Sequence, residues 1–166
     1  MIILGIDPGI GQVGWGAVKD EIGRQKAIDY GCFETSSKID LEERLTRIYD
    51  FITSLILKFT PEVLAIEQLY FSANSKTALI VGQARGVILL SASKSNLPTA
   101  SYTPLQVKQA LTGYGKADKN QIQSMVGSIL HLSKKIAQDD AADALAIAIT
   151  HAFSYKIRKV SCYKLK

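Results

Sequence analysis

The sequence predicts one α/β domain built on a mixed five-stranded sheet. Its 166 residues are 47% hydrophobic, enough to bury a single core, and only 21% are charged, which argues against disorder. Three strand-like runs come first and predict an antiparallel meander. Strand and helix patterns then alternate, which predicts parallel strands flanked by helices. No linker or internal repeat interrupts this order.

The first part of the chain contains the meander. Residues 2–7 are an apolar run that ends before Pro8 and Gly9, because proline cannot donate to a sheet and glycine permits a turn. The runs 12–19 and 25–35 are predicted to be the second and third strands.

An amphipathic helix is predicted after the meander. Asp40 fits an N-cap, and Glu43 would complete a capping box. Apolar residues then recur every three or four positions, which is the helical period: Leu41, Leu45, Ile48, Ile52, Leu55 and Phe59. A fourth strand is predicted at 62–67.

The rest of the chain is predicted to alternate once more and to end in helices. We expect a helix at about 75–93 and a fifth strand at 97–102. Thr103 and Pro104 are typical of a cap and a first helical position, and they open a short helix that ends at about Thr112. Gly113 and Gly115 then break the pattern. Two further helices are predicted, one starting at Asp118 with Gln121 and one at 138–153.

The order of elements resembles the ribonuclease H-like fold, with the domain spanning residues 1–153. Residues 154–166 are a basic tail, which fits either a flexible arm that adds DNA affinity or a frayed end. Up to residue 105 the chain has ten basic and eleven acidic residues, and after it ten and four. One face is therefore expected to attract polyanions, although a solvated surface explains the same numbers.

Cysteine use and hydropathy indicate the compartment. Cys32 and Cys162 have no CxxC partner, so free thiols in a reducing environment are expected. A carboxylate interrupts the N-terminal apolar run too early for a signal peptide, and no run approaches the roughly 20 apolar residues that cross a bilayer. We expect a cytoplasmic protein without a membrane partner.

Four carboxylates stand at positions that a sheet can bring together. Asp7 ends the first strand, Glu67 ends the fourth, and Asp140 and Asp143 share one face of the last helix. Carboxyl ends of strands meet at one rim, which a packed helix can join. Asp7 could instead be a turn former, and the helix pair could simply favour a helix N-terminus. Asp139 is an alternative ligand, but it points about 100° away from Asp140.

Clustered acids repel one another unless a cation neutralises them. Carboxylates select hard cations such as Mg²⁺, and two such ions can activate a water and hold the leaving oxygen of a phosphodiester. His131 and His151 are the only histidines, so no zinc set competes. As a set, the four acids predict a metal site.

The sequence resembles the RuvC family of Holliday-junction resolvases along nearly its whole length. The resemblance rests on motifs in this order: ILGIDPG (3–9), GWG (14–16), LAIEQLYF (64–71), GQARG (82–86), QVKQ (106–109) and DAADALAIAITH (140–151). It implies that Asp7, Glu67, Asp140 and Asp143 bind two Mg²⁺ ions, or Mn²⁺ in their place. It also implies symmetric nicking of four-way DNA junctions, with RuvA/RuvB-type branch-migration proteins as possible partners.

Aromatic and basic residues near these acids are candidates for DNA binding. Tyr70 and Phe71 follow the fourth strand, where an exposed ring could stack on an unpaired base, although one of the two could face the core. Lys108 and Lys119 match basic positions of the family, and we count Lys119 among the catalytic residues as well. Lysines of this kind could position phosphates, and so could three further polar residues: Asn74, Lys76 and Lys116.

Small residues on the 75–93 helix predict a dimer interface. Ala78, Gly82 and Gly86 recur every four residues, and a glycine inside a helix costs about 1 kcal/mol relative to alanine, so a packing reason is expected. Packing on the protein's own sheet is the alternative. Two symmetric cuts require two symmetric sites, which a homodimer supplies.

Two other functions fit parts of the sequence. An actin-like or sugar-kinase-like ATP-binding lobe also opens with a strand, an acid and glycines, but it needs a second lobe that 166 residues do not provide. Another ribonuclease H-like nuclease, acting on RNA–DNA hybrids or of the YqgF type, would share the fold. The IEQ and GQARG motifs favour the junction resolvase.

Overall fold

A computed structural model describes residues 1–21, 24–68 and 75–163, without the side chains of 75–77 and 156–163. Five strands form one sheet in the order β3-β2-β1-β4-β5. The strand β1 is antiparallel to β2 and parallel to β4, β2 is antiparallel to β3, and β4 is parallel to β5. The predicted mixed sheet is confirmed, with these strand bounds: β1 Ile2–Asp7, β2 Gln12–Glu21, β3 Arg24–Glu34, β4 Val63–Glu67 and β5 Thr99–Tyr102.

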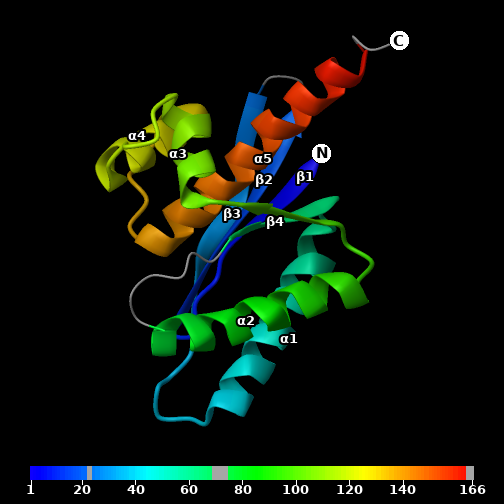
Figure 1. Cartoon of the computed structure of the whole chain (residues 1–166), viewed down its shortest axis with the longest axis vertical. Helices are drawn as coiled ribbons and strands as arrows, with labels where there is room; N and C mark the ends of the chain where they lie inside the picture. Colours follow the sequence, from blue (N-terminus) through cyan, green and yellow to red (C-terminus); the bar gives the residue numbers. More distant parts are fainter. Residues whose placement is uncertain (22–23, 69–74, 164–166) are drawn as a thin grey trace.

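Helices cover both faces of the sheet, as Figure 1 shows. The helices α1 (Leu41–Phe59) and α2 (Ser75–Lys94) lie side by side on one face. The helix α5 (Asp139–Tyr163) crosses the other face, with α3 (Pro104–Thr112) and α4 (Lys119–Ile129) packed against it. The domain therefore has two cores, one on each side of the sheet.

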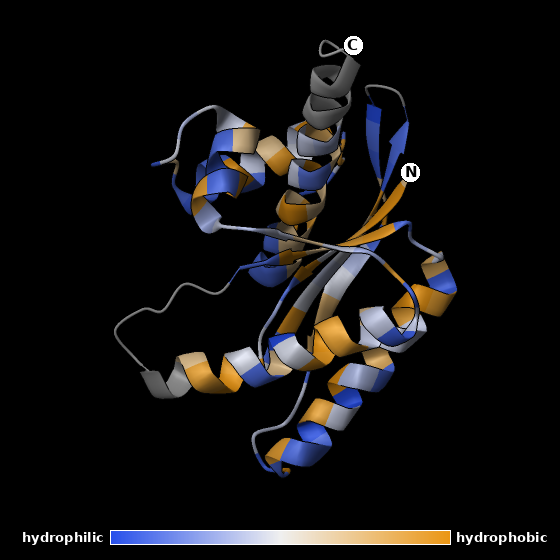
Figure 2. Ribbon diagram, turned by 45° about the vertical axis from the view of Figure 1, so that its right-hand side comes forward, coloured by the Kyte–Doolittle hydropathy of each residue, from blue (hydrophilic) through white to orange (hydrophobic). Residues whose placement is uncertain are grey.

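Alternation along the central strands separates the two cores. Leu4, Ile6, Leu64 and Ile66 face α1 and α2, whereas Ile3, Val63 and Ala65 face α5. All of these side chains are 6% exposed or less. Because β1 and β4 are covered on both sides, both are largely apolar, and Figure 2 shows the start of β1, next to the N-terminus, in orange.

Two helix ends differ in part from the prediction. Asp40 occupies the predicted N-cap position of α1, but its side chain makes no capping hydrogen bond. The predicted capping box is absent, and the Glu43 carboxylate accepts hydrogen bonds from Arg47 one turn later. The last helix continues to Tyr163 rather than ending at Phe153. Residues 154–163 contain neither glycine nor proline, so nothing in the backbone chemistry stops the helix there.

The other helix ends follow the predicted chemistry. Thr103 and Asp118 both form complete capping boxes, at α3 with Gln106 and at α4 with Gln121. Cys32 is a free thiol on β3, and the side chain of Cys162 lies outside the described ones. Within the described ranges, no helix combines the length and the hydropathy that crossing a membrane requires.

Candidate active site

The side chains of Asp7 and Glu67 lie on the same face of the sheet as α5. Side chains alternate along a strand, so Asp7 follows Ile3 and Gly5 on one face, and Glu67 follows Val63 and Ala65. β1 and β4 are parallel neighbours, so their carboxyl ends lie at the same rim. The sheet therefore presents two acids from distant segments toward one helix.

Glycines let α5 lie directly on the strands beside these acids. A Cβ added to Gly14 would lie 2.0 Å from the backbone oxygen of Asp140, and one added to Gly5 would lie 2.1 Å from that of Ala144. Gly14 is also the cross-strand partner of Asp7. The absence of a side chain at Gly14 thus places the first turn of α5 next to Asp7.

Asp7, Asp140 and Asp143 form a compact carboxylate cluster. One ligand oxygen from each lies within 4.8 Å of the other two. The spacing of three residues puts both helix aspartates on the face of α5 that meets the sheet. Glu67 is not part of this closest group, but it lines a cleft together with Asp143. Asp139 lies outside the cluster, in keeping with its direction on the helix.

Burial and mutual repulsion make the cluster a poor place for negative charge. Burial, followed by the charges of Glu67, Asp143 and Asp140, raises the pKa of Asp7 from 3.8 to about 7. Burial also raises the pKa of Glu67, with a contribution from Asp143. The pKa of Asp143 is raised by burial despite the opposing effect of Lys119. A cation bound among these oxygens would relieve both effects.

A cleft of about 260 Å³ opens beside the cluster and carries two of the predicted lysines. Lys108, on α3, and Lys119, the first residue of α4, line it with Glu67 and Asp143. Four apolar residues complete its walls: Pro104, Val107, Ile122 and Ile147. An anion that enters the cleft would meet both ammonium groups next to the carboxylates.

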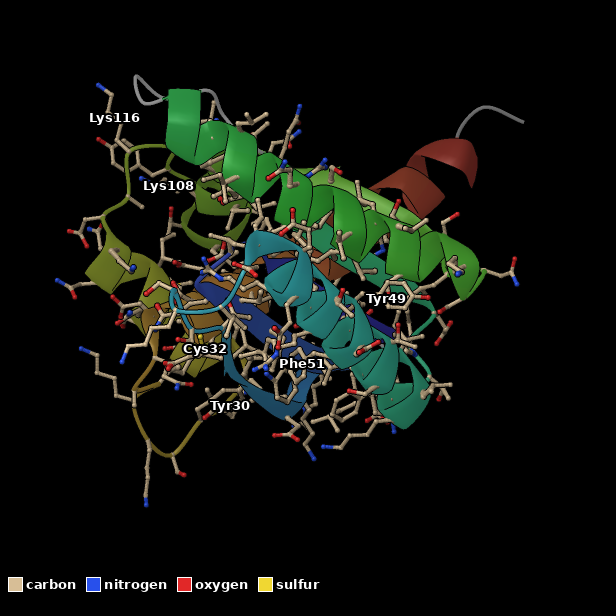
Figure 3. The ribbon with its side chains drawn as sticks, turned by 90° about the horizontal axis from the view of Figure 1, so that it is seen from below. Tyr30, Cys32, Tyr49, Phe51, Lys108 and Lys116 are labelled. Atoms are coloured by element: carbon tan, nitrogen blue, oxygen red, sulfur yellow. The ribbon has the colours of Figure 1, made fainter. Side chains whose placement is uncertain are left out.

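Lys116 is exposed and does not line this cleft, although it lies on the same side of the molecule as Lys108 (Figure 3). Three predicted DNA-contacting residues lie outside the described residues: Tyr70, Phe71 and Asn74. The backbone of Lys76 belongs to the first turn of α2, and its side chain is not described.

The predicted dimer stripe lies on α2. Gly86 is exposed, and a Cβ added to it would meet no atom within 4 Å. Close packing against the protein's own sheet therefore does not require a glycine at this position. Ala78 and Gly82 are half-buried. The residues of α2 that pack into the core are different ones: Ala84, Ile88 and Ala92.

Two residues next to the acids were not recognised from the sequence. Arg85, within the GQARG motif, donates from Nε to the backbone oxygen of Glu67 at 3.0 Å. Cys32, opposite Gly14 in the sheet, donates from Sγ to Oδ2 of Asp140 at 3.8 Å. Burial and the neighbouring Asp140 raise the pKa of the Cys32 thiol to about 11, so it remains a donor. Both contacts depend on tertiary structure and have no local sequence signal.

Comparisons with known proteins identify the family of this chain. The family described as "Crossover junction endodeoxyribonuclease RuvC" matches residues 3–151. Proteins of that name from Moorella thermoacetica and Caldicellulosiruptor saccharolyticus are 53% and 52% identical to the chain. The alignments cover 92% of this chain and 91% of the first relative, and 93% of this chain and of the second.

Solved structures give the same result. "T. thermophilus RuvC in complex with Holliday junction substrate" superimposes with a TM-score of 0.91 at 36% identity, covering 95% of this chain and 96% of that one. The yeast mitochondrial resolvase Ydc2 shares the fold at 16% identity and a TM-score of 0.67. The ribonuclease H-like fold is thereby confirmed, and the chain belongs to the RuvC family of crossover junction endodeoxyribonucleases.

Proposed function

We propose that this protein is a divalent-metal-dependent endonuclease that resolves four-way (Holliday) DNA junctions by paired symmetric nicks during recombination and repair. The observation that carries the proposal is the cluster of Asp7, Asp140 and Asp143, whose ligand oxygens lie within 4.8 Å of one another. A relative at 36% identity is described in complex with a Holliday junction substrate. We also propose that the protein acts in the cytoplasm.

The donor set fits Mg²⁺, with Mn²⁺ as a substitute. The cluster offers carboxylate oxygens only, which hard divalent cations prefer. Glu67, which lines the cleft together with Asp143, would extend the site to a second ion. Bound divalent cations would supply a polarised phosphate and an acidified water, the chemistry that phosphodiester hydrolysis needs. Asp7, whose pKa is about 7 without metal, would lose its proton when it becomes a ligand.

The lysines of the cleft would hold the DNA phosphate. Lys108, in the middle of α3, and Lys119, at the start of α4, line one cleft, so a phosphate oxygen can meet two ammonium groups. These contacts neutralise and orient the phosphate without reading the base sequence. The apolar walls, formed in part by Ile122 and Ile147, exclude water from one side of the site and strengthen these interactions.

The segment between β4 and α2 is proposed to open the junction. It follows Glu67, which lines the cleft, and precedes α2, which begins at Ser75. Tyr70 and Phe71 would stack on bases unpaired at the junction centre. Asn74 and Lys76 would bind backbone phosphates there, and Lys116 would add a contact on the same side.

We further propose a homodimer formed through α2. The exposed face of this helix carries Leu79, Gln83, Gly86 and Leu90, in which the two leucines are 66% and 53% exposed. These four positions share one face of a helix. A second copy on this face would bury the leucines and explain the glycine. It would also supply the second site that paired nicking requires, and branch-migration proteins of the RuvA/RuvB type would act on the same junction.

A cleavage assay with three substrates tests the proposed function. A synthetic mobile four-way junction, an RNA–DNA hybrid and a linear duplex are each incubated with and without Mg²⁺, and nicks are mapped on every strand. We expect nicks only in the junction, at symmetric positions in two opposed strands, and only with the metal. Cleavage of the hybrid in preference to the junction would instead assign a ribonuclease H activity.

A further inference from the structure

Asp139 holds Lys119 at the edge of the carboxylate cluster through a contact that spans two helices. The Lys119 ammonium lies 3.1 Å from Oδ2 of Asp139 and 3.6 Å from Oδ2 of Asp143. The other oxygen of Asp139 accepts a hydrogen bond from Nε2 of Gln123 at 2.7 Å. Both carboxylate oxygens of Asp139 are therefore engaged by α4, and neither faces the cluster as a ligand.

Gln123 fixes this arrangement from the core side. It lies one turn after Lys119 on the same face of α4, and only 9% of it is exposed. Lys119 itself is about half exposed and carries a long side chain with many rotamers. It also stands at a helix N-terminus, where the backbone dipole disfavours a cation. A fixed carboxylate at its tip is what keeps this lysine at the cleft.

We propose that Asp139 is a positioning residue for Lys119, which keeps the ammonium beside the site without leaving it on a metal-binding carboxylate. Asp143 and Asp139 are the two carboxylates in ion-pair range of Lys119 among the described residues. When cations occupy the cluster, they repel the ammonium from Asp143, and Asp139 retains it within reach of the phosphate. The inference rests on the proposed metal-dependent function.

Loss of Asp139 changes this balance in a defined way. Asp143 becomes the remaining ion-pair partner of Lys119 among the described residues, so an incoming cation must displace the ammonium from a metal-binding oxygen. Metal binding weakens as a result. Once displaced, Lys119 has no anchor, so the phosphate meets it less often and the cleavage rate at saturating metal falls. If Asp139 only stabilised the start of α5, its substitution would change the stability of the protein. Metal binding and the cleavage rate at saturating metal would stay the same.

Mn²⁺ binding to the full-length protein without DNA provides the first readout, by the electron paramagnetic resonance signal of free Mn²⁺. In Asp139→Asn we expect the half-saturating Mn²⁺ concentration to rise about threefold, the range of a single exposed ion pair. We expect kcat for junction cleavage at saturating Mg²⁺ to fall about fivefold, with junction binding in the absence of metal altered less than twofold. Asp139→Glu should restore part of both losses.

A double-mutant cycle separates positioning from the simple loss of a negative charge near the cluster. In a Lys119→Met background, Asp139→Asn should cause no further change in Mn²⁺ binding or kcat, because the residue acts through the lysine. An equal effect of Asp139→Asn in both backgrounds would overturn the inference, as would unchanged Mn²⁺ binding in the single variant.

The matched control is Asp29→Asn, which removes another aspartate–lysine pair, with Lys58 at 2.9 Å, on residues remote from the cleft. It should behave as wild type in every assay. Wild-type cleavage that needs no divalent cation would refute the proposed function itself, whereas normal metal-dependent cleavage with an inert Asp139 would refute only the role of Asp139.

Discussion

The guanidinium of Arg85 on α2 holds the backbone at Glu67, the last residue of β4. Its Nε donates to the Glu67 carbonyl oxygen at 3.0 Å, and a terminal nitrogen donates to Oγ of Ser101 on β5 at 2.9 Å. One side chain thus ties the ends of two parallel strands to the helix that follows the proposed DNA-opening segment. The position of the Glu67 carboxylate depends on this tie.

Arg85→Ala should therefore impair both stability and activity, although Arg85 binds the backbone of Glu67 and not its carboxylate. The Glu67 carbonyl loses a charge-assisted hydrogen bond, so we expect the free energy of unfolding to fall by about 1.5–3 kcal/mol, as measured by urea denaturation. Junction cleavage should fall about tenfold through misplacement of Glu67. Arg85→Lys should not restore it, because lysine lacks the fork that reaches both strand ends. Arg47→Ala, which removes an exposed arginine on α1, is the control and should change neither quantity.

Asp7→Asn should stabilise the metal-free protein at neutral and alkaline pH. The folded-state pKa of Asp7, about 7, lies above the value of 3.8 for an unperturbed aspartate. The folded state therefore resists ionisation, and stability is lost as pH rises from about 4 to about 7. Removing the charge should recover on the order of 3 kcal/mol at pH 8 in a chelator, and almost nothing at pH 4.

With added Mg²⁺, the wild type should instead be more stable than Asp7→Asn. The ion stabilises the wild type by binding to it, and it has fewer ligands in the variant. Thermal unfolding at both pH values, with chelator and with Mg²⁺, measures all four cases. A variant less stable than wild type in chelator at pH 8 would show that Asp7 is not held in a repulsive environment.

The central strands could be predicted from the sequence, and so could the position of an acid at the sheet edge after each of them. Both follow from short-range rules. Apolar runs identify β1 and β4, and an acid directly after each run must lie near the sheet edge. Spacing of three on a helix likewise makes Asp140 and Asp143 neighbours whatever the tertiary structure. Thr103 and Asp118 carry their capping partners within three residues, so both helix starts could be predicted too.

Features that depend on competition or on distant segments could not be predicted. Glu43 has two possible partners, and the choice of Arg47 over a capping bond is settled by small energy differences. Arg85 and Cys32 bind groups that are 18 and 108 residues away. The sequence indicates Asp139 only as a substitute ligand, because its partners Lys119 and Gln123 lie on another helix.

Gly14→Ala should damage the site by moving α5. Its new methyl group would lie 2.0 Å from the Asp140 backbone oxygen, so helix and strand must separate. We expect a loss of about 3 kcal/mol in the free energy of unfolding and of most junction cleavage, since Asp140 leaves the cluster. Gly127→Ala, within α4 and with no atom within 4 Å of the added Cβ, should instead stabilise the protein by about 0.5–1 kcal/mol. Equal effects of the two substitutions would contradict this account of Gly14.

Leu79→Asp should convert the proposed dimer into a monomer without unfolding it. Leu79 is 66% exposed on α2, so the charge costs little in the isolated chain but much in an apolar interface. Sedimentation velocity should show the change, and cleavage should then produce single nicks rather than paired ones. Leu57→Asp is the control, since Leu57 is 74% exposed on α1. A wild type that sediments as a monomer at micromolar concentration would refute the α2 interface.

The central claim is that carboxylates from β1, β4 and α5 meet to hold divalent cations. Anomalous diffraction from crystals soaked in Mn²⁺ tests it most directly, because the ion itself is located. We predict strong anomalous peaks in direct contact with the carboxylate oxygens of Asp7, Asp140 and Asp143, with a second ion toward Glu67. Peaks bound elsewhere, or an empty cluster at saturating Mn²⁺, would contradict the claim.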